Sequence, residues 1–385
     1  MLLAERHKIK STPQIVELCQ TSKELYNKCN YYMRKQWFSN LKNDDWNIPL
    51  PDITTLVNLV QCEESFKNLH NTKTAKQTVR KVLSDWSNFR KSIKVYNKDS
   101  SKFKSKPKPP KYKEKMAQVI FYNETIKKKP LRQGVITPTN NCFSIKSERK
   151  FKQVVITPKR FGFMIDVQYE KELPHKAKGE GICCIDIGLN NLAAITSDQF
   201  SPILINGRIV KSINQQYNKY PTKQNSRKRY FRLENYFHHA SKYIIDLCVK
   251  HNCETIIIGK NDGWKQEMNL GKKTNQNFQY VPFFNLIQKI EYKAALAGVR
   301  IVFTEESYTS KASYLDRDPL DGSKLSGKRV KRGLYKMASG QLINADVNGS
   351  CNIGRKVIRN ENKLLELDKS VAATPVRVNP LKVFV

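Results

Sequence analysis

Apolar side chains recur at a helical spacing through the first part of the chain. In residues 11–40 they return every three or four positions, which predicts an amphipathic helix. The same spacing predicts shorter helices at residues 53–60 and 79–93, and lysine and arginine are scattered around the last of them. Together these segments predict a small basic helical domain over residues 11–105.

A connector rich in lysine and proline follows at residues 102–115. Seven lysines are interleaved there with Pro107, Pro109 and Pro110. Proline excludes helix and favours an extended, polyproline-like backbone. The connector is therefore a candidate for following the phosphates of a nucleic acid.

From residue 118 to residue 170 the pattern changes to short runs of β-forming residues separated by turn residues. Five such strands at this spacing predict a small barrel or a curled sheet. Nothing in these strands points to catalysis. The polar stretch at residues 173–181 marks the next boundary.

Beyond residue 181, strands and helices alternate. The apolar runs predict a β-hairpin that turns at residues 188–191, and then a third strand. Next they predict a helix at 227–250, a strand at 254–259, a helix at 282–297, a strand at 299–304 and a last helix at 346–359. The order three strands, helix, strand, helix, strand, helix is that of the RNase H-like fold. The expected fold class is thus a multidomain chain of α+β and α/β type.

Charge identifies the kind of partner. Lysine and arginine total 69 against 34 acidic residues, which gives a net charge of +35 and a pI near 9.8. Self-repulsion on this scale is tolerated mainly when a polyanion neutralises it, so nucleic acid is the expected partner. Charge alone fits an RNA-binding protein of ribosomal type as well as it fits an enzyme.

Membrane and secretion signals are missing from the sequence. No stretch approaches the roughly 20 apolar residues of a membrane-spanning helix, and residues 1–10 lack the apolar run of a cleavable signal. The nine cysteines are odd in number and form no C-x-x-C pair, which is typical of reduced cytosolic thiols. We therefore expect no membrane partner and a cytosolic location.

Two aspartates stand where a metal-dependent nuclease of this fold needs them. Such nucleases hold two Mg²⁺ ions roughly 4 Å apart, one to activate the attacking water and one to stabilise the leaving oxygen. Asp186 ends the apolar run of the first strand, where a charge is costly unless it is paired or metal-bound. Asp346 opens the last predicted helix. Taken alone, Asp186 could be a turn residue and Asp346 a helix N-cap. Together with the elements predicted between them, the two aspartates indicate a catalytic pair.

Four segments resemble the successive RuvC segments of the TnpB family, transposon-encoded nucleases related to type V CRISPR effectors. They read IDIGLNNLA, IIIGKNDGWKQ, EESYTSK and NADVNGSCNIGRK, and the resemblance covers essentially the whole chain. It implies a wedge β-barrel from residues 1–10 and 110–178, an inserted helical recognition lobe at 11–105, a RuvC nuclease domain at 179–360 and a C-terminal tail at 361–385.

The resemblance also implies an activity. Proteins of this family bind a guide RNA derived from their own transposon end, open double-stranded DNA beside a short transposon-adjacent motif, and cut the DNA that matches the guide. For this chain it implies an RNA-guided DNA endonuclease with two Mg²⁺ ions, for which Mn²⁺ can substitute. The implied location is the bacterial cytosol, in association with the nucleoid.

The middle carboxylate departs from the commoner family pattern. A glutamate usually ends the fourth strand, but Gly259 stands there in this chain. Glu305 and Glu306 end the next strand, about 5 Å further out, and one of them could reach the same metal over the vacant space. A glutamate three residues ahead of the T-S-K segment occurs in some relatives, and Glu306 matches it. We therefore predict three catalytic metal ligands, Asp186, Glu306 and Asp346, with Glu305 as the alternative to Glu306.

The zinc ribbon of most relatives is missing from the sequence as well. Residues 309–336 contain no cysteine, whereas structural zinc needs Cys or His ligands, usually four. We expect no zinc, and a short basic loop at residues 307–340 in place of the ribbon. The side chains expected to contact phosphate in this loop are Lys328, Arg329, Lys331 and Arg332.

Further basic residues are expected to bind nucleic acid: Lys76, Arg80, Lys81, Lys106, Lys108, Lys111, Lys113, Arg227, Lys228 and Arg229. Two alternatives stay open. One is a catalytically weak or inactive RNA-guided DNA-binding protein that represses transcription, and the other is a resolvase or transposase that needs no guide. Filled acidic positions favour an enzyme over the first, and the large region ahead of residue 179 argues against the second.

Overall fold

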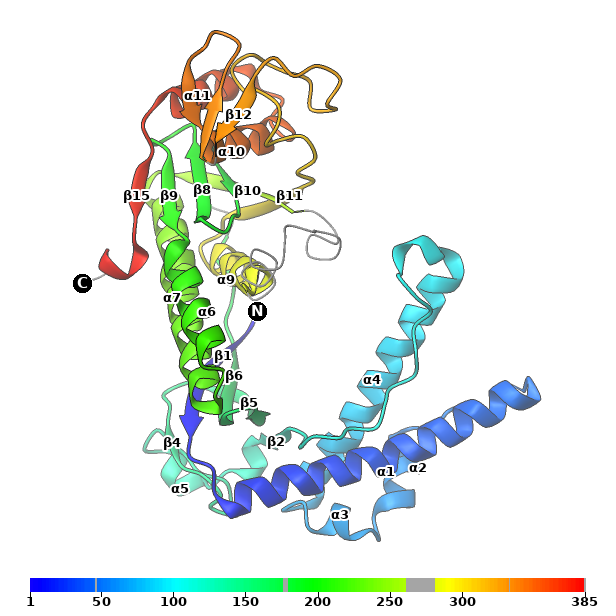
Figure 1. The fold of residues 1–385 in the computed structure, drawn as a ribbon. Helices are drawn as coiled ribbons and strands as arrows, with labels where there is room; N and C mark the ends of the chain where they lie inside the picture. Colours follow the sequence, from blue (N-terminus) through cyan, green and yellow to red (C-terminus); the bar gives the residue numbers. More distant parts are fainter. Residues whose placement is uncertain (46, 176–178, 261–280, 332, 384–385) are drawn as a thin grey trace. The chain divides into compact units, whose positions relative to one another are not determined.

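The computed structural model describes residues 1–385 except 46, 176–178, 261–280, 332 and 384–385 (Figure 1). The chain divides into two compact units, Met1–Glu172 and Leu173–Val385, and each is described by itself. In the described part of the chain, no helix is both long and apolar enough to cross a membrane.

Two long helices form the frame of the first unit. The Thr12 side chain caps the first of them by accepting a hydrogen bond from the Ile15 amide at 3.3 Å. Apolar faces of the helices enclose a core around Trp86, whose indole nitrogen donates to the buried Asn30 at 2.8 Å. The helices are α1 (Pro13–Asn43), α2 (Ile53–Val60), α3 (Glu64–Lys67), α4 (Thr72–Lys98) and, beside the sheet, α5 (Lys128–Leu131).

Four strands of the first unit form an open antiparallel sheet in the order β1-β6-β5-β2, and β3 and β4 form a separate two-stranded sheet. β1 pairs with β6 along its full length, so the first residues of the chain join strands from beyond residue 118. No closed barrel is present among the described strands, so the wedge β-barrel that the sequence predicted is not found and an open sheet stands in its place. The strands are β1 (Leu2–Ile9), β2 (Val119–Tyr122), β3 (Val135–Ile136), β4 (Ile145–Lys146), β5 (Phe151–Lys159) and β6 (Gly162–Glu170).

The connector runs along α1 without forming helix or strand, as its prolines predicted. Asn27 exchanges two hydrogen bonds with the Lys113 backbone, at 2.9 and 2.7 Å. Asn30 and Arg34 both donate to the carbonyl of Pro110, at 3.1 and 2.9 Å. Side chains of α1 thus satisfy backbone groups of the connector that proline withdraws from regular structure.

A mixed sheet in the order β11-β10-β7-β8-β9-β15 is the centre of the second unit. β7, β8 and β9 are antiparallel neighbours, whereas β10 runs parallel to β7 and β11 parallel to β10. All the predicted elements occur in the predicted order, with additional helices and strands between and after them. The strands are β7 (Gly181–Asp186), β8 (Asn191–Ser197), β9 (Ile203–Asn206), β10 (Cys253–Gly259), β11 (Arg300–Thr304) and β15 (Val376–Val378).

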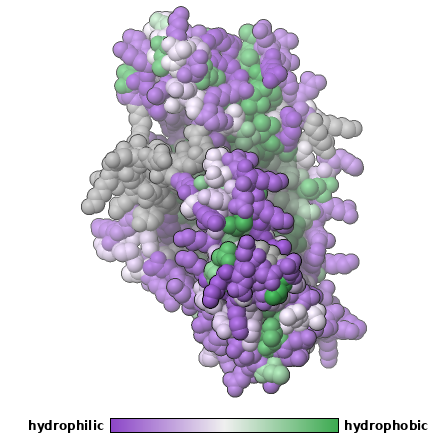
Figure 2. All heavy atoms as spheres, turned by 90° about the vertical axis from the view of Figure 1, so that its right-hand side faces the viewer, coloured by the Kyte–Doolittle hydropathy of each residue, from purple (hydrophilic) through white to green (hydrophobic). Residues whose placement is uncertain are grey.

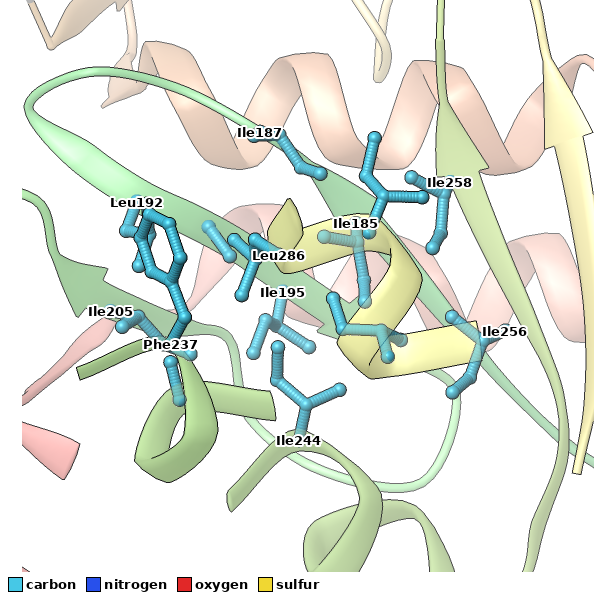
Figure 3. Packing of buried hydrophobic residues seen from close by; sticks show 14 of the residues in the cluster. Ile185, Ile187, Leu192, Ile195, Ile205, Phe237, Ile244, Ile256, Ile258 and Leu286 are labelled. Atoms are coloured by element: carbon cyan, nitrogen blue, oxygen red, sulfur yellow. The ribbon is translucent and has the colours of Figure 1, made fainter. Parts of the chain in front are cut away.

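Helices cover both faces of this sheet. On one face, Ile185, Ile256 and Ile258 pack against Phe237 and Leu286 of two helices (Figure 3). On the other face, the alternate strand residues pack against the last two helices. The helices are α6 (Arg208–Lys219), α7 (Lys223–Lys250), α9 (Phe283–Leu296), α10 (Ala345–Arg355) and α11 (Glu361–Ala372); α7 and α9 lie on the first face, α10 and α11 on the second.

The C-terminal residues belong to the sheet. β15 pairs in parallel with β9, and the Ser370 hydroxyl of α11 donates to the Ser197 carbonyl at 2.8 Å. The sequence treated residues 361–385 as a tail, but residues 376–378 form an edge strand of the second unit.

Residues 307–344 contain a small antiparallel sheet of β12 (Lys328–Lys331), β13 (Leu334–Lys336) and β14 (Leu342–Asn344). The buried Asp318 stabilises the loop that precedes this sheet. Its carboxylate accepts hydrogen bonds from the Ser313 amide at 2.7 Å and from the Ser326 hydroxyl at 2.5 Å. Hydrogen bonds to a carboxylate therefore hold this loop in shape.

Candidate active site

Asp186 lies at the end of β7, on the face of the sheet that α10 covers. Side chains alternate between the two faces along a strand, and Cys183 and Ile185 pack on the opposite face. Cys184, which precedes Asp186 by two residues, packs with α10. The strand thus places the Asp186 carboxylate toward α10.

Glycines bring α10 unusually close to β7. A Cβ atom at Gly349 would lie 2.8 Å from Asp186 Oδ2, and one at Gly354 would lie 2.5 Å from Cys184 Sγ. Both distances are shorter than any normal contact, so a larger residue at either position would require the contacted side chain or the helix to move. Of the two, Gly349 is the glycine that allows the close approach of the helix that carries Asp346 to the Asp186 carboxylate.

Polar residues of α10 fix the segment that follows β11. Asn352 donates to the carbonyls of Thr309 and Ala312 at 2.9 and 2.8 Å, and Asn348 accepts from the Tyr314 amide at 2.9 Å. All of these side chains are buried or nearly so. Because buried amides are expensive to leave unsatisfied, these bonds hold residues 309–314 against the helix.

Glu306 fills the space above Gly259. A Cβ atom at Gly259 would lie 2.6 Å from Glu306 Oε1 and 2.7 Å from its Cγ. The side chain from the end of β11 therefore crosses the end of β10, where the sequence predicted a vacant position. A residue larger than glycine at position 259 would displace this carboxylate.

Glu305 points elsewhere. Its carboxylate forms an ion pair with Lys356 at 3.1 Å and accepts a hydrogen bond from the Ser307 amide at 2.9 Å, and its side chain is 59% exposed. The alternation of β11 explains the difference, because Val302 packs with α10 and Ile301 with the opposite face. Continued past the strand end, this alternation puts Glu306, and not Glu305, on the face of Asp186.

Glu306 and Asp346 both act electrostatically on Asp186. Burial, together with the negative charges of Glu306 and Asp346, raises the pKa of Asp186 to about 8, while Arg329 opposes the rise. Burial and the charge of Glu305 together raise the pKa of Glu306 to about 7, while Lys356 opposes the rise. The structure thus brings Asp186, Glu306 and Asp346 together in one half-buried cluster.

Both carboxylate oxygens of Asp346 contact polar side chains. Asn191, at the start of β8, donates to its Oδ2 at 2.6 Å, and Arg329 of β12 lies 3.2 Å from its Oδ1. Neither contact was predicted from the sequence, from which Arg329 was expected to contact a nucleic-acid phosphate. Asn191 could have been suspected, because it ends the Gly188 turn that follows Asp186.

The donor set suits a hard divalent cation, which prefers carboxylate oxygens and would relieve the repulsion among the three groups. In the part of the chain that the structure describes, no group of three or more His, Cys, Asp or Glu side chains is already in position to hold a metal ion. Because Asn191 and Arg329 bind the two oxygens of Asp346, a metal bound through this carboxylate would have to displace one of these partners.

Basic residues predicted to bind nucleic acid also line a pocket in the first unit. Lys76 and Arg80 on α4 face β2 across a space of about 510 Å³, which Lys73, Tyr122 and Lys152 also line. Lys73 and Lys152 have acidic partners, Glu124 and Glu170. The pocket is wide and basic enough to take a phosphate group.

The connector lysines fall into two groups. Lys106, Lys108 and Lys111 are exposed, as contact with a phosphate backbone requires. Lys113 instead lies 3.7 Å from the centre of the Tyr26 ring. Lys81 on α4 is likewise engaged within the protein, in an ion pair with Asp85 at 2.7 Å.

The remaining basic residues lie in the second unit. Arg229 donates to the buried Asn214 at 2.6 Å, so it joins α7 to α6, a helix that the sequence analysis missed. Lys228 is exposed and Arg227 partly so, near the start of α7. Lys328 and Lys331 are exposed on β12, and Arg332 lies outside the described residues. Hydrophilic residues dominate the surface shown in Figure 2.

Comparison with known proteins finds a family match in the C-terminal part of the chain. Residues 283–353 match the family described as Cas12f1-like, TNB domain, and this stretch includes Glu306 and Asp346. The CRISPR-associated endodeoxyribonuclease Cas12f1 of Sulfoacidibacillus thermotolerans is 33% identical over 117 residues, which are 30% of this chain and 25% of that protein. The match thus spans a quarter of the length of this curated relative.

Solved structures show a weaker likeness. A Cas12f1-sgRNA-target DNA complex has a TM-score of 0.36 and 13% identity, covering 93% of this chain and 100% of that chain. A CRISPR-Cas12f ternary complex has a TM-score of 0.35 and 12% identity, covering 90% of this chain and 82% of that chain. The two sequence matches carry the relationship: this chain is a relative of Cas12f1-type proteins.

Proposed function

We propose that this protein is an RNA-guided DNA endonuclease of the TnpB type. In this proposal, Asp186, Glu306 and Asp346 form the metal site of a RuvC nuclease domain. The guide is an RNA from the transposon end, and the target is double-stranded DNA beside a transposon-adjacent motif. The sequence match to an endodeoxyribonuclease supports the general class of activity.

The position of Glu306 is the observation that carries the proposal. An enzyme that had simply lost the glutamate of the fourth strand would leave the space above Gly259 to a neutral side chain. Instead, a carboxylate from the next strand occupies that space, beside Asp186. The buried negative charge is costly in a protein that only binds nucleic acid, and it is useful in a metal-dependent nuclease.

Each part of the site has a separate task in the proposed reaction. Two Mg²⁺ ions, when bound, would activate the attacking water and stabilise the leaving oxygen. Asp186 on its strand and Glu306 beside it provide rigid oxygen donors, because the close packing of α10 limits their movement. Asp346 provides the third carboxylate at the start of α10, where Asn191 orients one of its oxygens.

The proposed RNA-binding elements lie in the first unit. The helical region presents Lys76 and Arg80, and the connector presents Lys106, Lys108 and Lys111 to solvent. Such contacts hold the phosphate backbone and the shape of RNA, while base pairing with the guide selects the sequence. The proposed wedge and recognition lobe correspond to the sheet and to the helices of this unit.

Guide reprogramming tests the proposal. The protein is produced together with RNA from its own locus, and the RNA that copurifies is sequenced. Replacing the guide segment of this RNA should redirect cutting of a plasmid to the new matching sequence. A target that stays fixed when the guide changes would instead indicate a resolvase or transposase.

Guided binding without cutting is the remaining outcome. The repressor alternative predicts that the protein occupies the matching DNA in a gel-shift assay but never cleaves it. That result, with Mg²⁺ present and a verified guide, would contradict the proposed nuclease activity while preserving RNA-guided recognition.

A further inference from the structure

Arg329 forms an ion pair with Asp346, whose carboxylate is one of the ligands in the proposed metal site. Its Nη2 atom lies 3.2 Å from Asp346 Oδ1, while Asn191 binds the other oxygen at 2.6 Å. The Asp346 side chain is 26% exposed and that of Arg329 is 44% exposed, so the pair lies at the edge of the site. The same guanidinium also lowers the pKa of Asp186. One cation therefore acts on two of the three carboxylates.

Arg329 lies on a strand that few contacts hold in place. β12 is the edge of its three-stranded sheet and, among the strands that the structure describes, pairs only with β13, and its register shifts between Arg329 and Lys331. All four of its residues are exposed. An edge strand with an irregular register and no buried side chain can move without disturbing a core.

Two ligands compete for each member of this pair. In the proposed metal site a divalent cation would bind the carboxylate of Asp346, which Arg329 already contacts, and their positive charges would oppose occupation at the same time. A guanidinium in turn binds phosphate at least as well as carboxylate, through paired hydrogen bonds. The exposed Lys328 and Lys331 on the same strand would draw a phosphate backbone toward Arg329.

We propose that Arg329 is an exchangeable counter-ion that regulates the metal site. Without nucleic acid it holds Asp346 Oδ1 and opposes binding of a divalent metal. A nucleic-acid phosphate at β12 takes Arg329 away from Asp346, so the carboxylate turns to the metal. This inference rests on the proposed function, in which Asp346 is a metal ligand.

The exchange links the two ligands in both directions. If phosphate at β12 strengthens metal binding, metal at Asp346 must strengthen nucleic-acid binding by the same factor. A partly exposed ion pair is weak, so we expect removal of Arg329 to raise metal affinity by about three- to tenfold. The ordinary expectation for a basic residue at a nuclease site, contact with phosphate alone, predicts no change in metal affinity.

The experiment measures Mn²⁺ binding to the full chain by isothermal titration calorimetry, without nucleic acid. Parent and Arg329→Gln are compared, and the site-specific part is the binding lost when Asp346→Asn is added to each. Arg317→Gln is the matched control. Arg317 forms an ion pair with Asp368 whose side chains are 40% and 27% exposed, almost the same as in the Arg329 pair, but Asp368 lies on α11 outside the carboxylate cluster.

We expect Arg329→Gln to bind Mn²⁺ about three- to tenfold more tightly than the parent, and Arg317→Gln to match the parent. Adding a nuclease-resistant phosphorothioate oligonucleotide should tighten Mn²⁺ binding to the parent and leave Arg329→Gln almost unchanged. The comparison is repeated on protein that keeps its copurified RNA, so that it does not depend on the nucleic-acid-free form.

Failure of the inference is distinct from failure of the proposed function. Equal Mn²⁺ affinities for the parent and Arg329→Gln, with binding that still depends on Asp346, would overturn the counter-ion role and keep the metal site. Mn²⁺ binding that Asp346→Asn does not reduce in either protein would overturn both.

Discussion

The α10 side of the sheet in the second unit and the connector in the first unit hold their polar side chains in opposite ways. At α10, Gly349 and Gly354 allow contact distances so short that a single added carbon would overlap Asp186 or Cys184. Along the connector, hydrogen bonds from α1 fix the backbone, while Lys106, Lys108 and Lys111 extend into solvent.

The difference shows how each kind of chemistry constrains structure. The proposed metal-dependent hydrolysis needs donor atoms placed to within fractions of an ångström, and the packed elements around Asp186 suit that need. Contact with a phosphate backbone needs only positive charge at the right spacing, and several residues share the work. Substitutions that remove or displace one of the carboxylates should therefore abolish activity one at a time, whereas substitutions in the connector should have graded effects that depend on salt.

Removing the metal should have the largest effect. The carboxylate cluster has no nucleophile of its own, so EDTA should reduce guided cleavage below detection, and Mg²⁺ or Mn²⁺ should restore it. Elemental analysis of the purified protein should find no stoichiometric zinc. Full cutting in excess chelator would contradict the RuvC assignment, and one zinc per chain would contradict the loss of the ribbon.

Replacement of Gly259 by a larger residue should have the second-largest effect. In Gly259→Ala the new carbon would overlap Glu306 and Ile353, so the carboxylate must move. We expect a loss of stability of about 1–3 kcal/mol, measured by urea denaturation. We also expect cleavage to slow by about tenfold or more at a temperature where the variant is folded.

Gly354→Ala is the matched control for this prediction. It creates a similar overlap, but with Cys184 Sγ and not with a carboxylate. It should lose comparable stability and keep most of its cutting rate once folded. Equal cleavage rates for the two folded variants would show that the position of Glu306 does not depend on Gly259.

Replacing connector lysines should have the smallest effect. The triple variant Lys106→Gln, Lys108→Gln and Lys111→Gln should bind RNA several-fold more weakly near physiological salt. The slope of log affinity against log salt should fall by about two, because each lost phosphate contact contributes about 0.7 for single strands. An unchanged slope would remove the connector from the binding surface.

Much of the fold follows from the sequence because apolar periodicity is a local signal. The long helix near residue 15, the β7–β8 hairpin and the alternation of strands and helices after it were all predicted. α6 and β15 were missed for physical reasons. α6 has a narrow apolar stripe in a strongly basic segment, and β15 is a three-residue edge strand that only pairing with β9 reveals.

The candidate site was predicted in part. Asp186 and Asp346 were predicted from their positions on the first strand and the last helix. Glu306 was chosen over Glu305 from the family resemblance, and the alternation of side chains along β11 would have given the same choice. The contacts of Asp346 with Asn191 and Arg329 were not predicted, because they join side chains 155 and 17 residues apart, and only the position of Asn191 after the Gly188 turn offered a hint. Asp318 was missed too, since a lone aspartate in a loop gives no sign of burial.

The most direct test of the central claim compares Glu306→Gln with Glu305→Gln. The two substitutions remove one charge each from adjacent residues, and glutamine keeps the volume that fills the space above Gly259. We measure guided plasmid cleavage together with target binding in a gel-shift assay. The account predicts that both variants bind like the parent, that Glu306→Gln cuts at least about a hundredfold more slowly, and that Glu305→Gln cuts normally. Normal cutting by Glu306→Gln would contradict it.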